Sequence, residues 1–330
     1  MTTRHRTMVG TVGTGIWISH DGERWSRCQG MWNETQVFAL TPHPQDPQVV
    51  FAGAHDGIYR SEDGGVTFEP IPSPLSGKAI WSVAFDPVQP ATIFAGGRPG
   101  AIFRSRDGGQ HWEQLNAQFA DACPNVRFPR VLSMAVDPTD HRIVWAGVEV
   151  DGVRRSLDGG ETWETTGAAV TPGKIGRQLN NPDIHGIVVS GTAPTTVLVS
   201  TPREIFASTD AGENWQPLGV QRHFPLPYCR AIALKADDPN VLFVANGDGA
   251  AGETGTVQRS KDRGQTWETL PLPIVPNTPI WTFAMHAADP NLMLTCSHYG
   301  QVFVSDNAGD SWRKISREFS EIRALAWVPN

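Results

Sequence analysis

The chain has 330 residues, of which 39% are hydrophobic and 18% are charged, and its formal net charge is −7. This composition is typical of a globular protein with a large core, and it excludes a disordered or fibrous chain. The negative charge argues against a nucleic-acid-binding protein, which needs a basic surface to neutralise phosphates. No stretch approaches the roughly 20 apolar residues of a membrane helix, and residues 1–10 lack the apolar run of a signal peptide. We therefore expect a cytoplasmic protein without a membrane partner.

The four cysteines are spread over the chain at Cys28, Cys123, Cys229 and Cys296, and no two of them have CxxC spacing. This pattern favours reduced thiols over a zinc site or a disulfide framework.

One motif occurs seven times, and it dominates the organisation of the chain. Each copy begins with serine, has an acidic residue or asparagine two positions later and ends with an aromatic residue. The marker residues at the third position are Asp21, Asp63, Asp107, Asp158, Asp210, Asp262 and Asn307, spaced by 42 to 52 residues. This period is typical of the four-stranded blade of a β-propeller.

The motif has the chemistry of a tight turn between two strands. Its carboxylate can accept backbone N–H groups within the loop, and its glycine supplies a positive φ. The aromatic residue, which is tryptophan except at Phe68, is expected to pack against the blade. The first copy is one residue shorter and the last has Asn307, so we expect weaker turns at these two places.

The segments between the motifs predict the remaining strands. One blade is expected to contain strands near 80–85, 91–96 and 101–104, with a short fourth strand after the motif. The chain begins with strands at 7–12 and 15–19 and ends with one at 321–329. We therefore predict an all-β fold, in which residues 1–330 form a single seven-bladed propeller of four-stranded antiparallel blades. Pairing of the N-terminal strands with the C-terminal strand would close the ring and hide two sheet edges.

The repeated motif resembles the Asp-box, or bacterial neuraminidase repeat. This repeat is shared by sialidases, sortilin-type receptors, xyloglucan-degrading enzymes and photosystem II assembly factors. The resemblance covers nearly the whole chain and implies structural turns on the face opposite the ligand-binding face. Sialidases also use six blades and an early Phe-Arg-Ile-Pro motif. The nearest string here, residues 126–130, has another order and lies in a later blade, so sialidase activity is not expected.

Two other branches of this resemblance predict features that the sequence does not show. Sortilin-type receptors carry a secretory leader and cysteine-rich modules after the propeller, and the xyloglucan-degrading enzymes use two propellers that face each other across a cleft. We therefore expect neither of these complete architectures here.

Alignment of the first strand of every blade predicts a ring of side chains at the mouth of the central channel. Its members differ in chemistry, whereas the position two or three residues later is mostly alanine. The ring consists of Gln36, Trp81, Leu132, His185, Arg230, Trp281 and Arg323. Such diversity favours a ligand pocket. The alternative is that Trp81 and Trp281 plug the channel.

Loops on the same face add further candidates. Arg98, Arg203, Asp248 and Tyr299 are candidate ligand-binding residues, and His55, Glu149 and His298 join His185 as candidate proton-transfer residues. Loops at about 116–130 and 166–184 are long enough to form a rim or lid. The charged side chains can equally be solvated loop groups. A divalent metal held by His55, His185 and His298 is a further alternative, and no other cofactor is predicted.

These residues favour an enzyme of the hydrolase or lyase type that acts on a small polar, anionic or carbohydrate ligand. Arg230, Arg323 and Arg98 would bind anionic groups, and Trp81 and Trp281 would stack on the ligand. His185, His55 or Glu149 would transfer protons. The first alternative is a non-catalytic propeller that grips a protein or peptide, like the photosystem II assembly factors. The second is a scaffold whose channel is filled by Trp81, Trp281 and Leu132.

Overall fold

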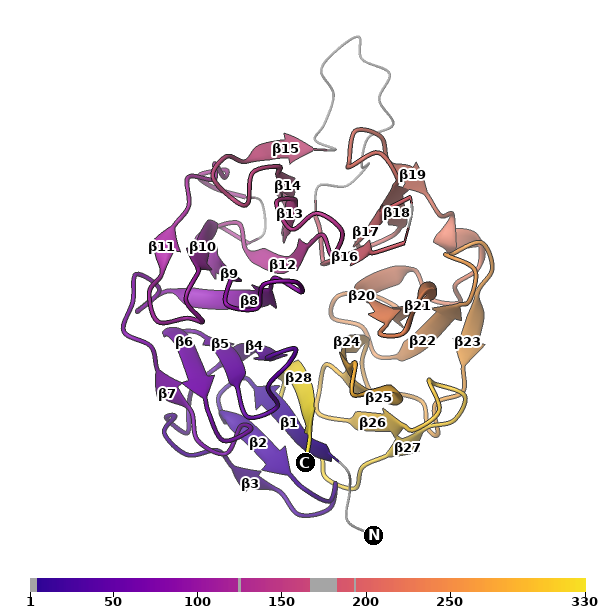
Figure 1. Cartoon of the computed structure of the whole chain (residues 1–330). Helices are drawn as coiled ribbons and strands as arrows, with labels where there is room; N and C mark the ends of the chain where they lie inside the picture. Colours follow the sequence, from indigo (N-terminus) through magenta and orange to yellow (C-terminus); the bar gives the residue numbers. More distant parts are fainter. Residues whose placement is uncertain (1–4, 124–125, 167–182, 193) are drawn as a thin grey trace.

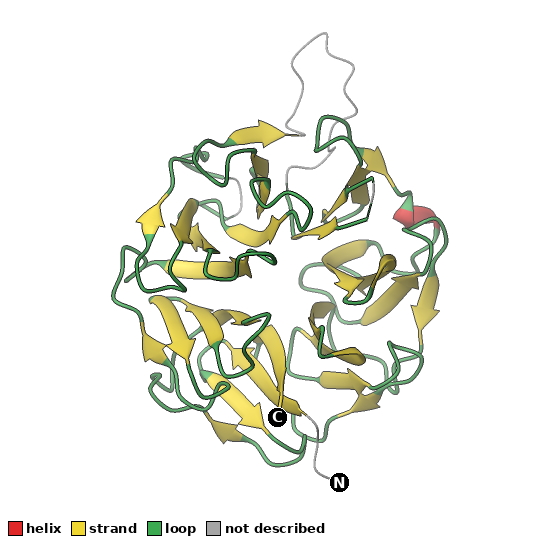
Figure 2. Ribbon diagram, viewed as in Figure 1, coloured by secondary structure: helices red, strands yellow, loops and turns green. Residues whose placement is uncertain are grey.

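The computed structural model describes residues 5–123, 126–166, 183–192 and 194–330, and it confirms the seven-bladed β-propeller. Seven four-stranded antiparallel sheets stand in a ring around a central channel (Figure 1). Within the described ranges, the only helix is the single 3₁₀ turn η1 (Val220–Arg222) (Figure 2). No helix of the described residues has the length and apolar character needed to cross a membrane.

The strands form four concentric layers. The innermost strands are β4 (Val37–Pro42), β8 (Ala79–Phe85), β12 (Val131–Val136), β16 (Gly186–Ser190), β20 (Tyr228–Lys235), β24 (Ile280–His286) and β28 (Ile322–Pro329). The second layer contains β5 (Val50–Ala54), β9 (Ile93–Arg98), β13 (Val144–Val148), β17 (Thr196–Ser200), β21 (Asp238–Gly247), β25 (Asp289–Ser297) and β1 (His5–Thr11). The third layer contains β6 (Gly57–Ser61), β10 (Ala101–Ser105), β14 (Gly152–Ser156), β18 (Ile205–Ser208), β22 (Gly255–Ser260), β26 (Val302–Ser305) and β2 (Ile16–Ser19). The short outermost strands are β7 (Glu69–Pro70), β11 (Glu113–Gln114), β15 (Glu164–Thr166), β19 (Gln216–Pro217), β23 (Glu268–Leu270), β27 (Arg313–Lys314) and β3 (Ser26–Arg27).

The two ends of the chain close the ring by sharing one blade. β28 pairs antiparallel with β1, from His5 opposite Pro329 to Thr11 opposite Ile322. The blade therefore has the order β28, β1, β2, β3, and its innermost strand comes from the other end of the sequence (Figure 1). The predicted pairing of N-terminal and C-terminal strands is confirmed.

Apolar second-layer strands hold neighbouring blades together. All five residues of β5 and all five of β13 are buried. Close packing requires glycine at Gly53 and Gly96, where an added Cβ would lie 2.6 Å from the carbonyl oxygen of Ile80 and 2.5 Å from Cγ1 of Val131. These neighbours belong to the innermost strand of the next blade, so the two glycines set the spacing of the blades.

The seven repeated motifs form the predicted turns between the third and fourth strands. In one of them, Asp158 Oδ1 accepts the backbone N–H of Thr162 at 2.9 Å, and Ser156 Oγ accepts that of Gly160 at 2.7 Å. The hydrogen bonds to Thr162 hold the pKa of Asp158 at about 2. The turn with Asn307 keeps this pattern, because its Oδ1 accepts the N–H of Ser311 at 2.9 Å.

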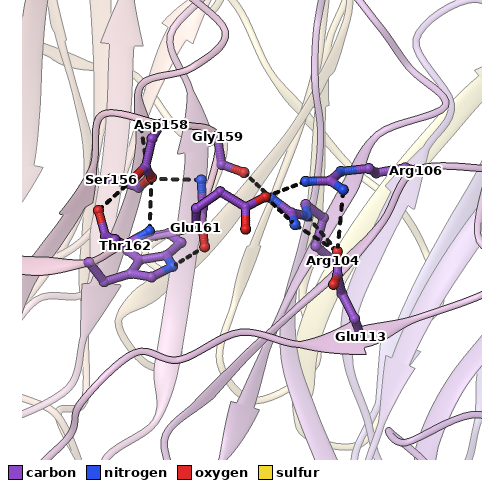
Figure 3. A network of polar contacts seen from close by, with 10 residues as sticks. Arg104, Arg106, Glu113, Ser156, Asp158, Gly159, Glu161 and Thr162 are labelled. Atoms are coloured by element: carbon purple, nitrogen blue, oxygen red, sulfur yellow. Dashed lines mark hydrogen bonds and ion pairs between the residues drawn. The ribbon is translucent and has the colours of Figure 1, made fainter.

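In three of the blades, a buried arginine of the third strand binds the following blade. Arg104, whose side chain is 2% exposed, binds Glu113 of its own blade and Glu161 of the following motif turn at 2.7 and 2.8 Å (Figure 3). It also donates to the carbonyl oxygen of Gly159. Arg155 and Arg259 repeat these contacts in two other blades. We call this arrangement the arginine clamp.

Arg60 occupies the same position in its blade but does not form the clamp. The following motif turn has Gln110 where the clamped turns have an acidic residue, and Arg60 instead pairs with Glu62 at 3.0 Å. A cavity of about 530 Å³ lies at this junction, lined by Arg60, Glu69 and Gln110 among others. This junction thus lacks the ion pair to the next blade, and a cavity lies beside Arg60.

The clamp predicts a difference between two equivalent arginines. Replacement of Arg104 by alanine removes the contacts to Gly159 and Glu161 of the next blade, so we expect the free energy of unfolding to fall by about 1–3 kcal/mol. The matched control is Arg60→Ala, which breaks no contact between blades and should cost about 1 kcal/mol or less. Chemical denaturation of both variants measures the difference. Equal losses would contradict a role of the clamp in holding the blades together.

Candidate functional site

The channel mouth is shaped by an irregularity shared by the innermost strands. The register shifts by one residue in β4, β8, β12, β20, β24 and β28 where each of them pairs with the second strand. In β8, for example, Ile80 pairs with Gly97 and Ser82 with Gly96, so Trp81 has no partner of its own. Such a bulge turns the extra side chain out of the ladder, and here it directs that residue into the channel.

A polar cavity of about 190 Å³ results at the mouth. Six of the seven predicted ring residues line it, namely Trp81, Leu132, His185, Arg230, Trp281 and Arg323. Phe38 lines it in place of the predicted Gln36. Gln36 precedes β4 and uses its backbone to bind His55, whereas Phe38 is the bulged residue of β4 and stacks on Trp81 with ring centroids 4.1 Å apart. The residue at the bulge of each strand is therefore the one that lines the cavity, and its distance from the end of the strand does not identify it.

Guanidinium groups cover the tryptophan rings of this cavity. Arg230 lies 4.1 Å from the centroid of Trp281, and Arg323 lies 4.8 Å from the same ring and 6.0 Å from Trp81. Arg130, from the segment before β12, lies 4.6 Å from Trp81. The electron-rich ring faces stabilise these cations. Arg230 and Arg323 line the cavity, so their N–H groups are the donors available there.

Two of the three arginines are neutralised by carboxylates. Arg130 pairs with Glu149, and Arg323 pairs with Glu321. Arg230 has no ion pair with any of the residues that the structure describes. Burial lowers the pKa of Arg323, and the charges of Arg230 and Arg130 lower it further against the opposing effect of Glu321. Three cations in one small space thus repel one another, and an anion placed between Arg230 and Arg323 would relieve this repulsion.

His185 forms the second polar group of the cavity. Its Nδ1 donates to the carbonyl oxygen of Cys229 at 2.9 Å, and its Nε2 lies 3.4 Å from Oδ2 of Asp183. Burial raises the pKa of Asp183, but the hydrogen bond from His185 and the charge of Arg230 outweigh this, so the pKa lies below its usual value. The carboxylate is therefore ionised at neutral pH and orients the imidazole.

His298 and Tyr299 extend the stack outward from the cavity. His298 lies against Trp281 with ring centroids 3.8 Å apart and planes 10° apart, and Tyr299 covers its other side at 4.8 Å. His298 Nε2 also lies 3.1 Å from Oε1 of Glu321. His298 does not itself line the cavity, and it stacks on the lining residue Trp281.

The other predicted site residues lie outside the cavity lining. The Arg98 guanidinium donates to the carbonyl oxygen of Val126, and Arg203 is exposed. Asp248 accepts the backbone N–H groups of Glu253 and Thr254 and so serves its own loop. His55 is exposed beside Asp56, and Gln36 binds its backbone. The cavity thus collects the ring residues but not these loop residues.

A metal site finds no support in the described part of the chain. No group of three or more histidine, cysteine, aspartate or glutamate side chains gathers there in a way that could hold an ion. The four cysteines are free and buried. Residues 167–182 of the predicted rim lie outside the described residues.

Sequence reasoning missed four residues that shape the site: Phe38, Arg130, Asp183 and Glu321. Asp183 and Glu321 precede His185 and Arg323 by two residues, and this spacing was the available signal. Arg130 has the same spacing before Leu132, although its stacking on Trp81 could not be read from it. Phe38 carries no such signal, because its role depends on where the bulge lies.

Comparison with known proteins relates the chain to β-propeller proteins. It is 26% identical over 302 residues to a protein named Xyloglucanase Xgh74A from Acetivibrio thermocellus, which covers 78% of this chain and 35% of the relative. The chain thus spans about a third of the length of the curated relatives it matches first.

Two solved structures show the same fold. The xyloglucanase from Xanthomonas campestris superposes with a TM-score of 0.66 at 19% identity, over 98% of this chain and 52% of that one. A structure titled "YCF48 bound to D1 peptide" gives a TM-score of 0.58 at 17% identity, over 86% of this chain and 81% of that one.

The family model described as "Sortilin, neurotensin receptor 3" matches residues 56–171 and 204–327, which is most of the chain. The match concerns the propeller repeats themselves. The chain belongs to the Sortilin-Vps10 family.

Proposed function

We propose that the channel mouth binds a small molecule with an anionic group, and that the protein is a hydrolase acting on that molecule. The observation that carries this proposal is the pair Arg230 and Arg323, stacked on Trp281 beside one cavity. Arginine in this setting is suited to planar anions such as carboxylates.

The cavity limits the size of the ligand head group. Its volume of about 190 Å³ is below the roughly 300–1,000 Å³ of pockets for drug-sized ligands. A single sugar unit, a sugar acid or a small carboxylate matches it better than a polysaccharide does. Phe38 stacks on Trp81 and His298 stacks on Trp281, so these partners cover part of the indole rings. The ligand would therefore contact the guanidinium groups of Arg230 and Arg323 more than the indole faces.

The hydrolase assignment rests on His185 and on the relatives. Xyloglucanases, which their name describes as acting on a carbohydrate, are among the relatives and the structural neighbours. His185 lines the cavity, and its two ring nitrogens face acceptors, the carbonyl oxygen of Cys229 and Oδ2 of Asp183, which is the arrangement of a general acid. Water would attack the substrate, the bond to the leaving group would break, and the leaving oxygen would take the proton from Nε2 of His185. The proton of the attacking water would pass to solvent, while Arg230 and Arg323 hold the anionic part of the substrate in place.

A second candidate is a non-catalytic binding site. The carboxylates around the cavity are engaged: Glu149 with Arg130, Glu321 with Arg323 and Asp183 with His185. This pairing stabilises a fixed cationic surface instead of leaving a carboxylate ready for proton transfer. The structural neighbour titled as bound to a peptide supports this reading.

We also infer that the seven turns are Asp-box repeats. The hydrogen bonds from the turn backbone to Asp158 and Asn307 support this inference. Their side chains lie in the turns between third and fourth strands, at the opposite end of the blades from the bulged ring.

Binding is tested first with thermal shift. A small carboxylate or sugar acid present at about 100 times its dissociation constant stabilises the protein by about 2.7 kcal/mol, which raises the melting temperature of a chain of this size by about 4 °C. We expect Arg230→Ala to abolish the shift, because it removes the guanidinium without an ion pair. The control is Arg142→Ala, which removes an exposed arginine paired with Asp140 and should leave the shift intact.

Turnover separates the two candidates. Hydrolysis of chromogenic glycosides and esters by the wild type, lost in His185→Ala while the thermal shift remains, supports the hydrolase. A thermal shift without hydrolysis of any such substrate favours the binding protein. Absence of any shift with every anion would contradict both.

His298 provides a test of the charge distribution at the mouth. Burial lowers its pKa to about 4, the charge of Arg323 lowers it too, and Glu321 acts in the opposite direction. The imidazole is therefore neutral at neutral pH. The pKa of His298 in the folded protein is below that of the unfolded chain, so folding favours the neutral ring. The contribution of this neutral ring to the free energy of unfolding is complete above about pH 6.5 and is lost as the pH falls toward 4.

We expect the side-chain NMR signal of His298 to titrate near pH 4, and to titrate at higher pH in Arg323→Ala because a nearby positive charge is removed. The spectrum of His298→Gln assigns the signal. Titration of His298 near pH 6.5 in the wild type would show that the ring is not buried beside Arg323 as described.

A further inference from the structure

The channel below the arginines has the opposite chemistry to the mouth. A cavity of about 480 Å³ is lined there by side chains from β8, β12, β16, β20 and β24, including Phe85, Met134, Leu234 and Met285. A second cavity of about 340 Å³ is lined by β4, β24 and β28 and shares Phe283 and Met285 with the first. All seven innermost strands thus contribute to an apolar lower channel.

This lower channel leaves apolar side chains without a covering. Phe85, Val189, Leu234, Phe283 and Met285 are all partly exposed, although they lie at the centre of the molecule. Among the described residues that line the two cavities there is no aspartate, glutamate, lysine or arginine. Their titratable residue is His286, whose pKa is lowered by burial. Apolar surface of this kind, concentrated in a concave site, is typical of a binding site.

The two cavities adjoin each other along the innermost strands. Ile232 lines both the polar cavity at the mouth and the apolar cavity below it. On β12, Ser133 lines the upper cavity and Met134 the lower one, and on β24 the same holds for Thr282 and Phe283. The change from polar to apolar lining therefore takes place within one residue along these strands.

We propose that the ligand is an amphipathic carboxylate, whose head group lies at Arg230 and Arg323 and whose apolar chain extends past Ile232 into the lower channel. This inference rests on the proposed anion site and specifies the class of molecule that fills it. Charge complementarity fixes the head at the mouth, since the lower channel offers no cation. The apolar tail removes from water the side chains that the fold leaves partly exposed, and the two methionines adapt to tails of different shape.

The experiment measures the affinity of straight-chain carboxylates from acetate to decanoate by calorimetry, below the concentrations at which they form micelles. Each methylene that enters the lower channel should tighten binding about fourfold. Arg230→Ala should weaken all members of the series by a similar factor of about 10 or more and leave the dependence on chain length unchanged.

A substitution in the lower channel tests where the chain goes. Ala233 lines the lower cavity and is partly exposed to it, so Ala233→Phe fills space without displacing core side chains. We expect this variant to bind acetate and butyrate like the wild type but to lose the gain in affinity for the longer chains. The control is Val88→Phe at an exposed turn, where the gain should remain.

The possible failures are distinguishable. Carboxylates that all bind with the same affinity would overturn the amphipathic ligand and leave the anion site standing. A gain with chain length that Ala233→Phe does not reduce would place the apolar chain elsewhere and also overturn it. If no carboxylate binds, the proposed anion site falls together with this inference.

Discussion

The antiparallel pairing of β28 with β1 is the contact on which the site depends. It joins the two ends of the chain in one blade and so holds seven innermost strands around a closed channel. It also places Arg323, which lies at the register shift between β28 and β1, beside Trp81 and Trp281 of two other blades. Without this closure the stacked cations would lose a member, and the last blade would present an unpaired edge.

The bulges of the innermost strands then convert a structural ring into a chemical one. A regular strand would direct alternate side chains into the two flanking interfaces between blades, where apolar packing holds the ring together. The extra residue escapes this constraint, because it belongs to neither interface. Packing thus determines the residues on either side, such as the buried Ile80 and Ser82, while Trp81 between them lines the channel and carries Phe38 and Arg130. The upper part of the channel, at the bulges, can therefore carry cations, while the lower part of the same innermost strands is apolar.

Much of this architecture could be predicted from the sequence, and the limits have physical reasons. The seven motifs specify the blades because each turn is built from local hydrogen bonds, such as those of Asp158 with its own loop. Ring members such as Trp81 and Arg230 followed from strand alignment. The prediction that Gln36 belongs to the ring was wrong, because alignment of the strand ends cannot locate a bulge. The position of the bulge depends on how β4 pairs with β5. The stacking of Arg130 on Trp81 and the contact of Glu321 with His298 join different blades, and the sequence of one strand does not specify such contacts.

The central claim is that Arg230 and Arg323 form an anion site at the mouth of a channel that continues into apolar surroundings. A crystal structure of the protein soaked with 3-bromopropionate tests it directly, because bromine is located by its anomalous scattering. The account predicts the carboxylate between the two guanidinium groups and the bromine on the side of Ile232. Bromine found only outside the channel at saturating concentration, with the space between Arg230 and Arg323 unchanged, would contradict it.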